Sequence, residues 1–231
     1  MITTMKLHRP FFAGIGLAMV LPIFLITPPK KKTKLFLPNK KTEWHTFLNG
    51  GVGKNNDPKN VFVFEGDVLH VSGNGFGYIA TEKNYGDFHF TVEFKWGEKR
   101  YPPRENAKRD AGIMYHVILY SGDKVWPRSL EYQIQEGDCG DFWMTDSTTI
   151  RHADSITTAV RSLRIIKSKD AEKPKGEWNK AEVIVKNGKI THLLNGEIVN
   201  EGGLGNTKTG NIILQSEGAE VYYRNAVVEE L

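Results

Sequence analysis

Residues 87–96 alternate regularly between apolar and polar side chains. Every second residue from Phe88 to Trp96 is aromatic or Val, and the residues between them are His, Thr, Glu and Lys. Side chains of a β-strand point alternately to opposite faces, so this pattern places the apolar set on one face of a sheet. We therefore expect a sheet with one face in a hydrophobic core and the other face in water.

Shorter runs of strand-forming residues are spread along the rest of the chain. Two Asn-Gly pairs, at residues 187–188 and 195–196, favour type I′ hairpin turns. Residues 155–167 fit either a pair of strands or a short helix. About a dozen short strands and no long amphipathic helix predict an all-β fold, an antiparallel two-sheet sandwich or jelly roll. The other expected strands are Val61–Phe64, Val68–Val71, Tyr78–Thr81, Ala111–Leu119, Glu182–Lys186, Lys189–Leu194, Asn211–Gln215 and Val221–Glu229.

Length and composition limit the classes of function. The chain has 231 residues, which suits one β-rich domain, because single sandwiches often reach about 200–250 residues. Its net charge of +4 comes largely from lysines between residues 30 and 41, and the remainder is near neutral. We therefore expect no nucleic-acid partner. The single cysteine, Cys139, excludes an internal disulfide and a cysteine-rich zinc site.

The N-terminal end has the features of an export signal. Basic side chains precede residues 11–26, an uncharged and mainly apolar run. This run is short for a membrane-spanning helix, which needs about 20 residues, but it suits the core of a signal peptide. We expect residues 1–29 to be a signal peptide or a membrane anchor, residues 30–42 a basic linker, and residues 43–231 the folded domain. The protein would then be periplasmic, extracellular or membrane-anchored, with membrane contact only through an uncleaved N-terminal segment.

The segment Arg128–Trp143 combines a strand with an acidic, glycine-rich loop. Alternation places Glu131, Gln133 and Gln135 on one face of the strand and three apolar side chains on the other. Such a strand is suited to lining a polar cleft, and sugars are bound by planar polar groups beside aromatic rings. We therefore predict a carbohydrate site here. The plainer alternative is an ordinary half-solvated strand followed by an acidic turn.

The same strand resembles the catalytic strand of sandwich glucanases, with one difference. Those enzymes carry two glutamates around an aspartate, spaced E-x-D-x-x-E. Glu131, Gln133 and Glu136 fit this spacing, but Gln133 replaces the aspartate. A retaining hydrolase needs two carboxyl groups with pKa values pushed apart, and Gln133 cannot supply the negative charge between them. A conventional β-glucanase is therefore disfavoured, while a non-catalytic glycan-binding module remains compatible with these residues.

Seven blocks of sequence together resemble the 3-keto-disaccharide hydrolase family. They occur in the family's order, cover residues 44–231, and imply a sandwich like that of the concanavalin A-like lectins and glucanases. Many members carry Asn near Asp110 and Arg at His116, so roles at these two positions can differ. The blocks are Trp44–Gly50, Gly77–Phe90, Asp110–His116, Leu130–Trp143, Gly176–Asn179, His192–Gly196 and Leu214–Asn225.

The resemblance implies cleavage of a glucoside or disaccharide already oxidised to a ketone at C3. The ketone acidifies the proton at C2, so a base can remove it and the C1 substituent can leave by elimination. Addition of water to the product completes a net hydrolysis. Such a site needs a general base, a group that stabilises the enolate oxygen, and a donor for the leaving group. A divalent cation could polarise the ketone.

The proton-transfer roles are assigned from alternation and block position. Glu131 is the leading base, because it is the carboxylate on the polar face of the central strand. His116 is the second candidate, as base, acid or metal ligand. Gln133 and Gln135 are expected to hold sugar hydroxyls. The plainer interpretations are a solvated strand glutamate and a structural histidine.

The remaining assignments concern substrate and cation binding. Asp110 is expected to bind the substrate, Lys95 or Arg109 to stabilise the enolate, and Trp143 to stack on a sugar ring. Ordinary surface charges and a core tryptophan are the alternatives. His192, Gln215 and Glu217 lie in matching blocks without a role that the sequence defines. The acidic loop offers oxygen ligands for a cation, as hard cations prefer, at Glu136, Asp138 and Asp141.

Overall fold

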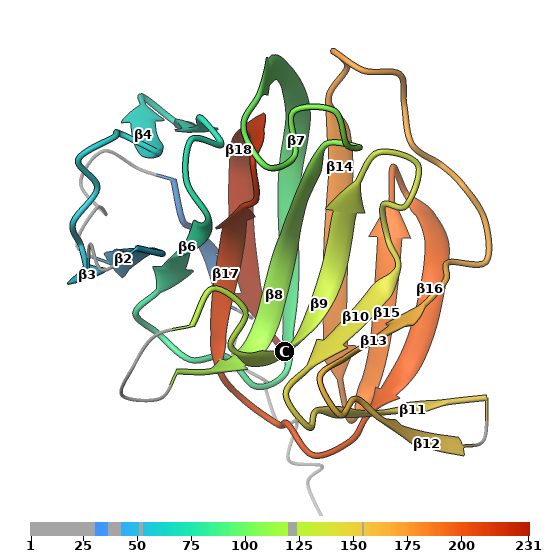
Figure 1. The fold of residues 1–231 in the computed structure, drawn as a ribbon. Helices are drawn as coiled ribbons and strands as arrows, with labels where there is room; N and C mark the ends of the chain where they lie inside the picture. Colours follow the sequence, from blue (N-terminus) through green and yellow to red (C-terminus); the bar gives the residue numbers. More distant parts are fainter. Residues whose placement is uncertain (1–30, 37–42, 51–52, 120–123, 154) are drawn as a thin grey trace, which may run out of the picture.

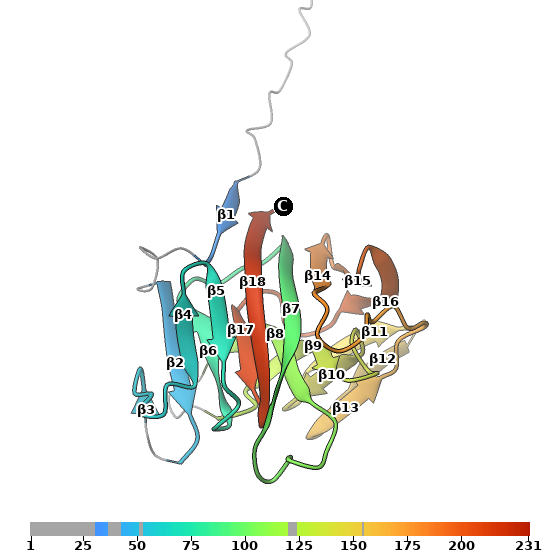
Figure 2. The ribbon, with the colours of Figure 1, turned by 90° about the horizontal axis from the view of Figure 1, so that it is seen from above.

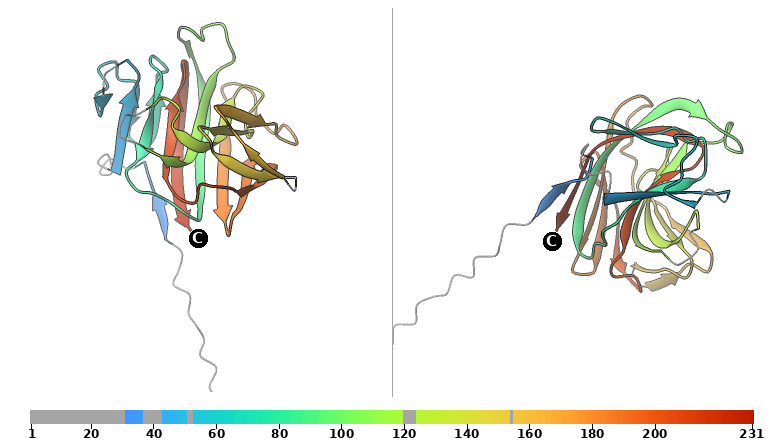
Figure 3. Two further views of the ribbon diagram at one scale, coloured as in Figure 1. Left: turned by 60° about the horizontal axis from the view of Figure 1, so that its bottom comes forward. Right: turned by 90° about the vertical axis from the view of Figure 1, so that its left-hand side faces the viewer.

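The computed structural model describes residues 31–36, 43–50, 53–119, 124–153 and 155–231. These residues form two antiparallel sheets stacked face to face (Figures 1 and 3). The predicted all-β sandwich is confirmed. Across the described ranges, no helix is long and apolar enough to cross a membrane. Residues 1–30, on which the export prediction rests, lie outside them.

The ten-stranded sheet forms one layer. Its long central strands pair in the order β14, β7 and β18, and shorter strands extend it on both sides. In spatial order the strands are β12 (Ser155–Thr158), β11 (Thr149–His152), β16 (Glu197–Leu204), β15 (Lys189–Leu194), β14 (Asn179–Lys186), β7 (Phe88–Arg100), β18 (Ala219–Glu230), β5 (Val68–Val71) and β4 (Phe62–Glu65), with β1 (Lys32–Lys34) also paired to β18.

The eight-stranded sheet forms the second layer. Its centre is made by β9, β8 and β17, which Figure 1 shows in front of β7 and β18. In spatial order the strands are β13 (Ser162–Ile165), β10 (Phe142–Thr145), β9 (Arg128–Gln135), β8 (Asp110–Ile118), β17 (Asn211–Ser216), β6 (Gly77–Thr81), β2 (Trp44–Leu48) and β3 (Gly53–Lys54).

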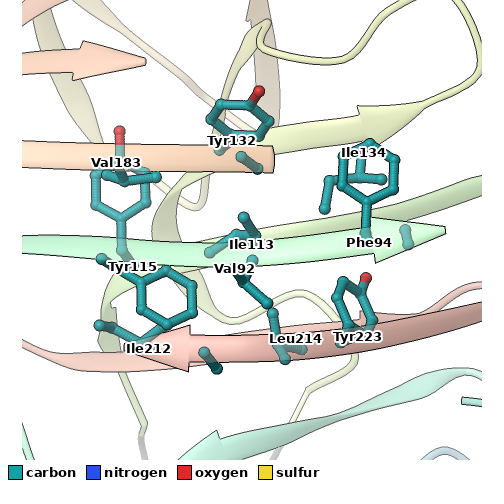
Figure 4. Packing of buried hydrophobic residues seen from close by; sticks show 14 of the residues in the cluster. Val92, Phe94, Ile113, Tyr115, Tyr132, Ile134, Val183, Ile212, Leu214 and Tyr223 are labelled. Atoms are coloured by element: carbon teal, nitrogen blue, oxygen red, sulfur yellow. The ribbon is translucent and has the colours of Figure 1, made fainter. Parts of the chain in front are cut away.

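The hydrophobic core lies between the two sheets. The apolar set of β7 is almost completely buried, and it belongs to one cluster with the apolar face of β9. Figure 4 shows side chains from the two layers meeting, such as Val92 of β7 and Ile113 of β8. Because burying one such side chain contributes about 1.5–3 kcal/mol, this layer fixes which face of each sheet stays outside.

Local predictions are confirmed at both Asn-Gly turns. Asn187 and Gly188 have φ values of 50° and 79°, and Asn195 and Gly196 have values of 54° and 86°. Two consecutive positive φ values are what a type I′ turn requires. The turns connect β14 to β15 and β15 to β16.

The segment 155–167 forms strands, but they do not pair with each other. β12 pairs with β11 in the ten-stranded sheet, whereas β13 pairs with β10 in the eight-stranded sheet. The chain therefore crosses from one layer to the other between these strands. Of the two alternatives predicted for this segment, strands are present and a short helix is not, and the two strands have separate partners.

Part of the predicted linker belongs to the fold. Lys32–Lys34 is a strand that pairs with β18, as Figure 2 shows. Leu35 and Phe36 follow it and are buried, and the amide of Leu35 donates to the carbonyl of Ala226 at 2.9 Å. Residues 32–36 therefore pack against the C-terminal strand, and the folded unit begins before residue 43.

Candidate active site

A polar cleft of about 600 Å³ lies on the exposed face of the eight-stranded sheet. We call this surface the cleft face, defined by Glu131, Gln133 and Gln135 of β9. The alternating residues Leu130, Tyr132 and Ile134 are buried in the core, as the pattern predicts. The other lining residues are Arg104, Asp110, Trp126, Trp143, Thr145, Asp146, Arg161, Ser162 and Glu217.

Glu131 lies on the floor of the cleft with 5% of its surface exposed. Its side chain extends over β8, where Gly112 leaves the space that it occupies. A Cβ atom added at Gly112 would collide with Oε1 of Glu131 and with Oε1 of Gln215. Burial, and then the negative charge of Glu217, raise the pKa of Glu131 well above its ordinary value, against the positive charge of Arg104.

Glu217 is a second buried carboxyl group in the same cleft. It follows β17, directly before the turn at Gly218 that leads into β18, and 4% of its surface is exposed. Trp126 donates its indole N–H to Oε1 of Glu217. Burial raises the pKa of Glu217, whereas the Trp126 hydrogen bond and the charge of Arg104 act in the opposite direction.

Arg104 is brought to the cleft by the long loop between β7 and β8. The loop is attached to the Glu217 turn, because the amide of Tyr101 donates to the carbonyl of Gly218 at 2.7 Å. Arg104 forms an ion pair with Asp110, and Asp110 also accepts a 2.9 Å hydrogen bond from Nε2 of Gln133. These contacts hold the guanidinium group of Arg104 beside the carboxyl groups of Glu131 and Glu217.

Two aromatic side chains stand at the borders of the cleft. Trp126 is 46% exposed, and its ring packs edge-on against Phe76 with centroids 6.3 Å apart. Trp143 on β10 is paired in register with Glu131, so it stands next to the carboxyl group across the sheet. Accessible aromatic rings beside polar groups are suited to contact with the apolar faces of sugar rings, and Trp143 is partly buried whereas Trp126 is exposed.

Two cations predicted to stabilise the enolate lie elsewhere. Lys95 is on the opposite side of the molecule, where its Nζ lies 5.1 Å from the ring centroid of Trp178 and 5.6 Å from that of Tyr222. Arg109 is buried and donates to the carbonyl of Gly97 at 3.1 Å and to Glu136 at 2.7 Å. The structure instead brings Arg104 to the cleft.

His116 is not among the residues that line the cleft. It occupies an irregularity in β8, with φ of 50°, and its Nε2 contacts the carbonyl of Gly86 at 2.9 Å. Burial lowers the pKa of His116, so the neutral ring is favoured. The geometry fits a structural histidine and does not place it with Glu131.

The three predicted cation ligands are held by basic groups. Glu136 pairs with Arg109, Asp138 with Lys108 at 2.8 Å, and Asp141 with Arg164. Within the described part of the chain, no group of three or more His, Cys, Asp or Glu is arranged to hold a metal ion. The hypothesis of a cation site in this loop is therefore not supported, because its carboxylates already neutralise cations.

Sequence reasoning gave no role to several cleft residues, among them Glu217, Arg104 and Trp126. Glu217 belongs to a block that resembles the family, and this was the available signal for it. Arg104 lies in the long polar loop between β7 and β8, and loops of this length often carry function. Nothing in the local pattern around Trp126 distinguishes it from an ordinary surface or core tryptophan.

Comparison with known proteins identifies the family. The sequence profile of the 3-keto-alpha-glucoside-1,2-lyase-like domain matches residues 32–229. The chain belongs to this family. The resemblance found in the sequence blocks is thereby confirmed. No curated protein matches the chain.

Solved structures similar to this family member confirm the concanavalin A-like sandwich. A candidate glycosyl hydrolase from Parabacteroides distasonis has a TM-score of 0.58 and 22% identity, with 87% of this chain and 94% of that chain covered. A carbohydrate-binding module from Bacillus subtilis has a TM-score of 0.52 and 10% identity, with 81% of this chain and 96% of that chain covered. The β-glucanase of Bacillus licheniformis has a TM-score of 0.50 and 12% identity, with 87% of this chain and 98% of that chain covered.

Proposed function

We propose that this protein cleaves 3-keto-glucosides by removing the C2 proton, eliminating the C1 substituent and adding water. The observation that carries the proposal is the pair of buried carboxyl groups, Glu131 and Glu217, in one cleft with the guanidinium of Arg104. Carboxyl groups with raised pKa values in a cleft are typical of proton-transfer sites. A module that only binds glycans has no need of them.

Each part of the cleft has a role in this chemistry. A carboxylate accepts the C2 proton, and the electron pair moves toward the C3 oxygen, where Arg104 stabilises the developing enolate. Asp110 orients Arg104, and Gln133 supports Asp110 through its amide. Trp126 and Trp143 would flank the sugar and its leaving group, and Gln135, which lines the cleft, would contact a hydroxyl group.

A conventional glucanase mechanism fits the strand less well. Of the two glutamates in the glucanase spacing, Glu131 lies in the cleft, whereas Glu136 is paired with Arg109 and does not line the cleft. Gln133 occupies the position of the intervening aspartate. The strand therefore lacks the paired carboxylates on which retaining hydrolysis depends.

The proposal is tested with two chromogenic glucosides, one plain and one oxidised at C3. We expect the purified full chain to release the chromophore from the keto substrate faster than spontaneous elimination does, and to leave the plain substrate intact. Release from the plain glucoside would favour a glucanase. Binding of both sugars without release would favour a glycan-binding module.

Export is also part of the proposal, and it rests on the apolar run at residues 11–26. Fractionation of producing cells should find the protein in the periplasm, in the medium or in the membrane fraction. Recovery of the intact chain from the cytoplasm alone would contradict export.

A further inference from the structure

We propose that the two buried carboxyl groups divide the proton transfers, with Glu217 as the base at C2 and Glu131 as the acid that protonates the leaving group. This inference rests on the proposed function and assigns the roles within it. It differs from the hypothesis drawn from the sequence, in which Glu131 is the base. The environments of the two side chains, which differ in their neighbouring donors and acceptors, carry the argument.

Two groups beside Glu217 favour its ionised form and partly offset the effect of its burial. The indole N–H of Trp126 points at Oε1, and a hydrogen bond from a neutral donor stabilises a carboxylate. Arg104 lies in the same cleft, and the turn at Gly218 is attached to the loop that carries it. Glu217 therefore has a donor and a nearby cation, which are the partners expected for a resting base.

Glu131 faces an acceptor instead. Oε1 of Glu131 and Oε1 of Gln215 occupy the same small space above Gly112, because a Cβ atom there would collide with both. Only 1% of Gln215 is exposed. Among the described residues, neither Nε2 nor Oε1 of its side-chain amide has a hydrogen-bond partner. Two neighbouring oxygens repel unless one carries a proton. A protonated Glu131 that donates to Gln215 would satisfy the buried amide oxygen.

The other charged groups near Glu131 agree with this distribution. Arg104 is partly neutralised by its ion pair with Asp110, and the other charged residues that line the cleft are Asp146, Arg161 and Glu217. Among the described residues no ion pair involves Glu131, whereas Glu217 accepts a hydrogen bond from Trp126. We therefore assign the proton of this carboxyl pair to Glu131.

The reaction then balances without a further reagent. Glu217 takes the C2 proton, a C1–C2 double bond forms as the C1–O bond breaks, and Glu131 gives its proton to the departing oxygen. In the second half, the oxygen of a water molecule bonds to C1 while Glu131 takes a proton from that water. Glu217 returns a proton to C2. Both groups regain their starting protonation, and the net change is hydrolysis.

The test compares leaving groups on the same 3-keto-glucose unit. A methyl substrate needs a proton on its leaving oxygen, whereas a 4-nitrophenyl substrate leaves as a stable anion. For Glu131→Gln we expect kcat/KM to fall about 10²-fold or more with the methyl substrate and less than about 10-fold with the nitrophenyl substrate. For Glu217→Gln we expect similar large losses with both, because each substrate must lose its C2 proton.

Retained nitrophenyl activity also demonstrates that Glu131→Gln is folded. Equal losses on both substrates for Glu131→Gln, or leaving-group dependence in Glu217→Gln instead, would overturn the division of roles. These outcomes require an active wild-type protein. If the wild type fails to accelerate either keto substrate, the proposed function itself is wrong, so the two failures are distinguishable.

Gln215 is a positioning residue in this scheme, and it has its own test. Gln215→Met keeps the volume and removes the acceptor for the Glu131 proton. We expect the alkaline limb of the kcat/KM profile with the methyl substrate to move by about one pH unit toward lower pH. A lower rate at every pH with an unmoved limb would indicate a merely structural role and contradict this part of the proposal.

Discussion

The acidic side chains on the two exposed faces of the sandwich have opposite environments. On the cleft face, Glu131 and Glu217 are buried beside each other, and their pKa values are raised. On the outer face, which is the exposed face of the ten-stranded sheet carrying Glu93 and Glu182, carboxylates pair with cations. Glu182 contacts Lys180 at 2.8 Å, and Glu93 contacts Arg224 at 2.7 Å.

The difference separates stability from function. Hydrogen bonds from His89 and Lys180 lower the pKa of Glu182 from its ordinary 4.5 to about 2, so its ionised form stabilises the fold. The cleft carboxyl groups are kept in an environment that disfavours their charge and therefore cost stability. Buried acids that form no ion pair are expected where a chain uses them for chemistry.

The largest expected effect concerns the cleft cation. Arg104→Ala removes the group that stabilises the enolate, and kcat/KM on a 3-keto substrate should fall about 10²–10³-fold. Added guanidinium should restore part of the rate, since it can enter the vacated position. The matched outer-face variant Arg224→Ala should keep the wild-type rate. If both variants were equally active, the cleft cation would have no catalytic role.

Substitution of the outer-face carboxylate should change stability instead. The lowered pKa of Glu182 corresponds to at most about 3 kcal/mol, so Glu182→Gln should reduce the free energy of unfolding at neutral pH by up to that amount. In the wild type this contribution is fully present above the ordinary value of 4.5 and is lost as the pH falls through about 2. Urea unfolding at neutral and acidic pH measures both.

An exposed glutamate provides the control for that measurement. Glu201 contacts Lys189 at the surface, with 46% of its side chain exposed, and Glu201→Gln should change stability by less than about 0.5 kcal/mol. Equal effects at positions 182 and 201 would remove the distinction between a partly buried ion pair and a surface pair.

The smallest expected effect has the opposite sign. Because the pKa of Glu131 is raised in the folded protein, its contribution to stability is present below its unfolded pKa and declines as the pH rises through the folded value. Glu131→Gln should therefore raise Tm at neutral pH and make Tm less dependent on pH. A lower Tm for this variant would indicate that Glu131 stabilises the fold and would contradict the comparison.

Alternation in the sequence predicted which side chains of each central strand face the core and which face solvent. It could not predict which of the two sheets each strand belongs to. The prediction for β9 was correct, because its apolar and polar sets occupy opposite sides. Lys95 also lies on the polar side of its strand, yet that side belongs to the outer face. A sandwich has two wet faces, and the period of two alone does not distinguish them.

Residues supplied by distant segments could not be predicted at all. Glu217 reaches the cleft because β17 pairs with β8, and Arg104 reaches it because its loop is hydrogen-bonded to Gly218. Sequence reasoning chose Arg109 from the same loop, and the structure uses that side chain to hold Glu136. Which of two nearby arginines enters a cleft depends on loop packing, which a local pattern does not contain.

The most direct measurement of the central claim is the kinetic isotope effect at C2. The 4-nitrophenyl 3-keto-glucoside is prepared with hydrogen or deuterium at C2, and wild-type kcat/KM is compared for the two forms. Leaving-group departure is fast in this substrate, so the account predicts that the deuterated form reacts several-fold more slowly. Equal, enzyme-dependent rates for the two forms, together with full retention of the deuterium at C2 in the released sugar, would show that the C1 bond breaks without removal of the C2 proton, and would contradict the account.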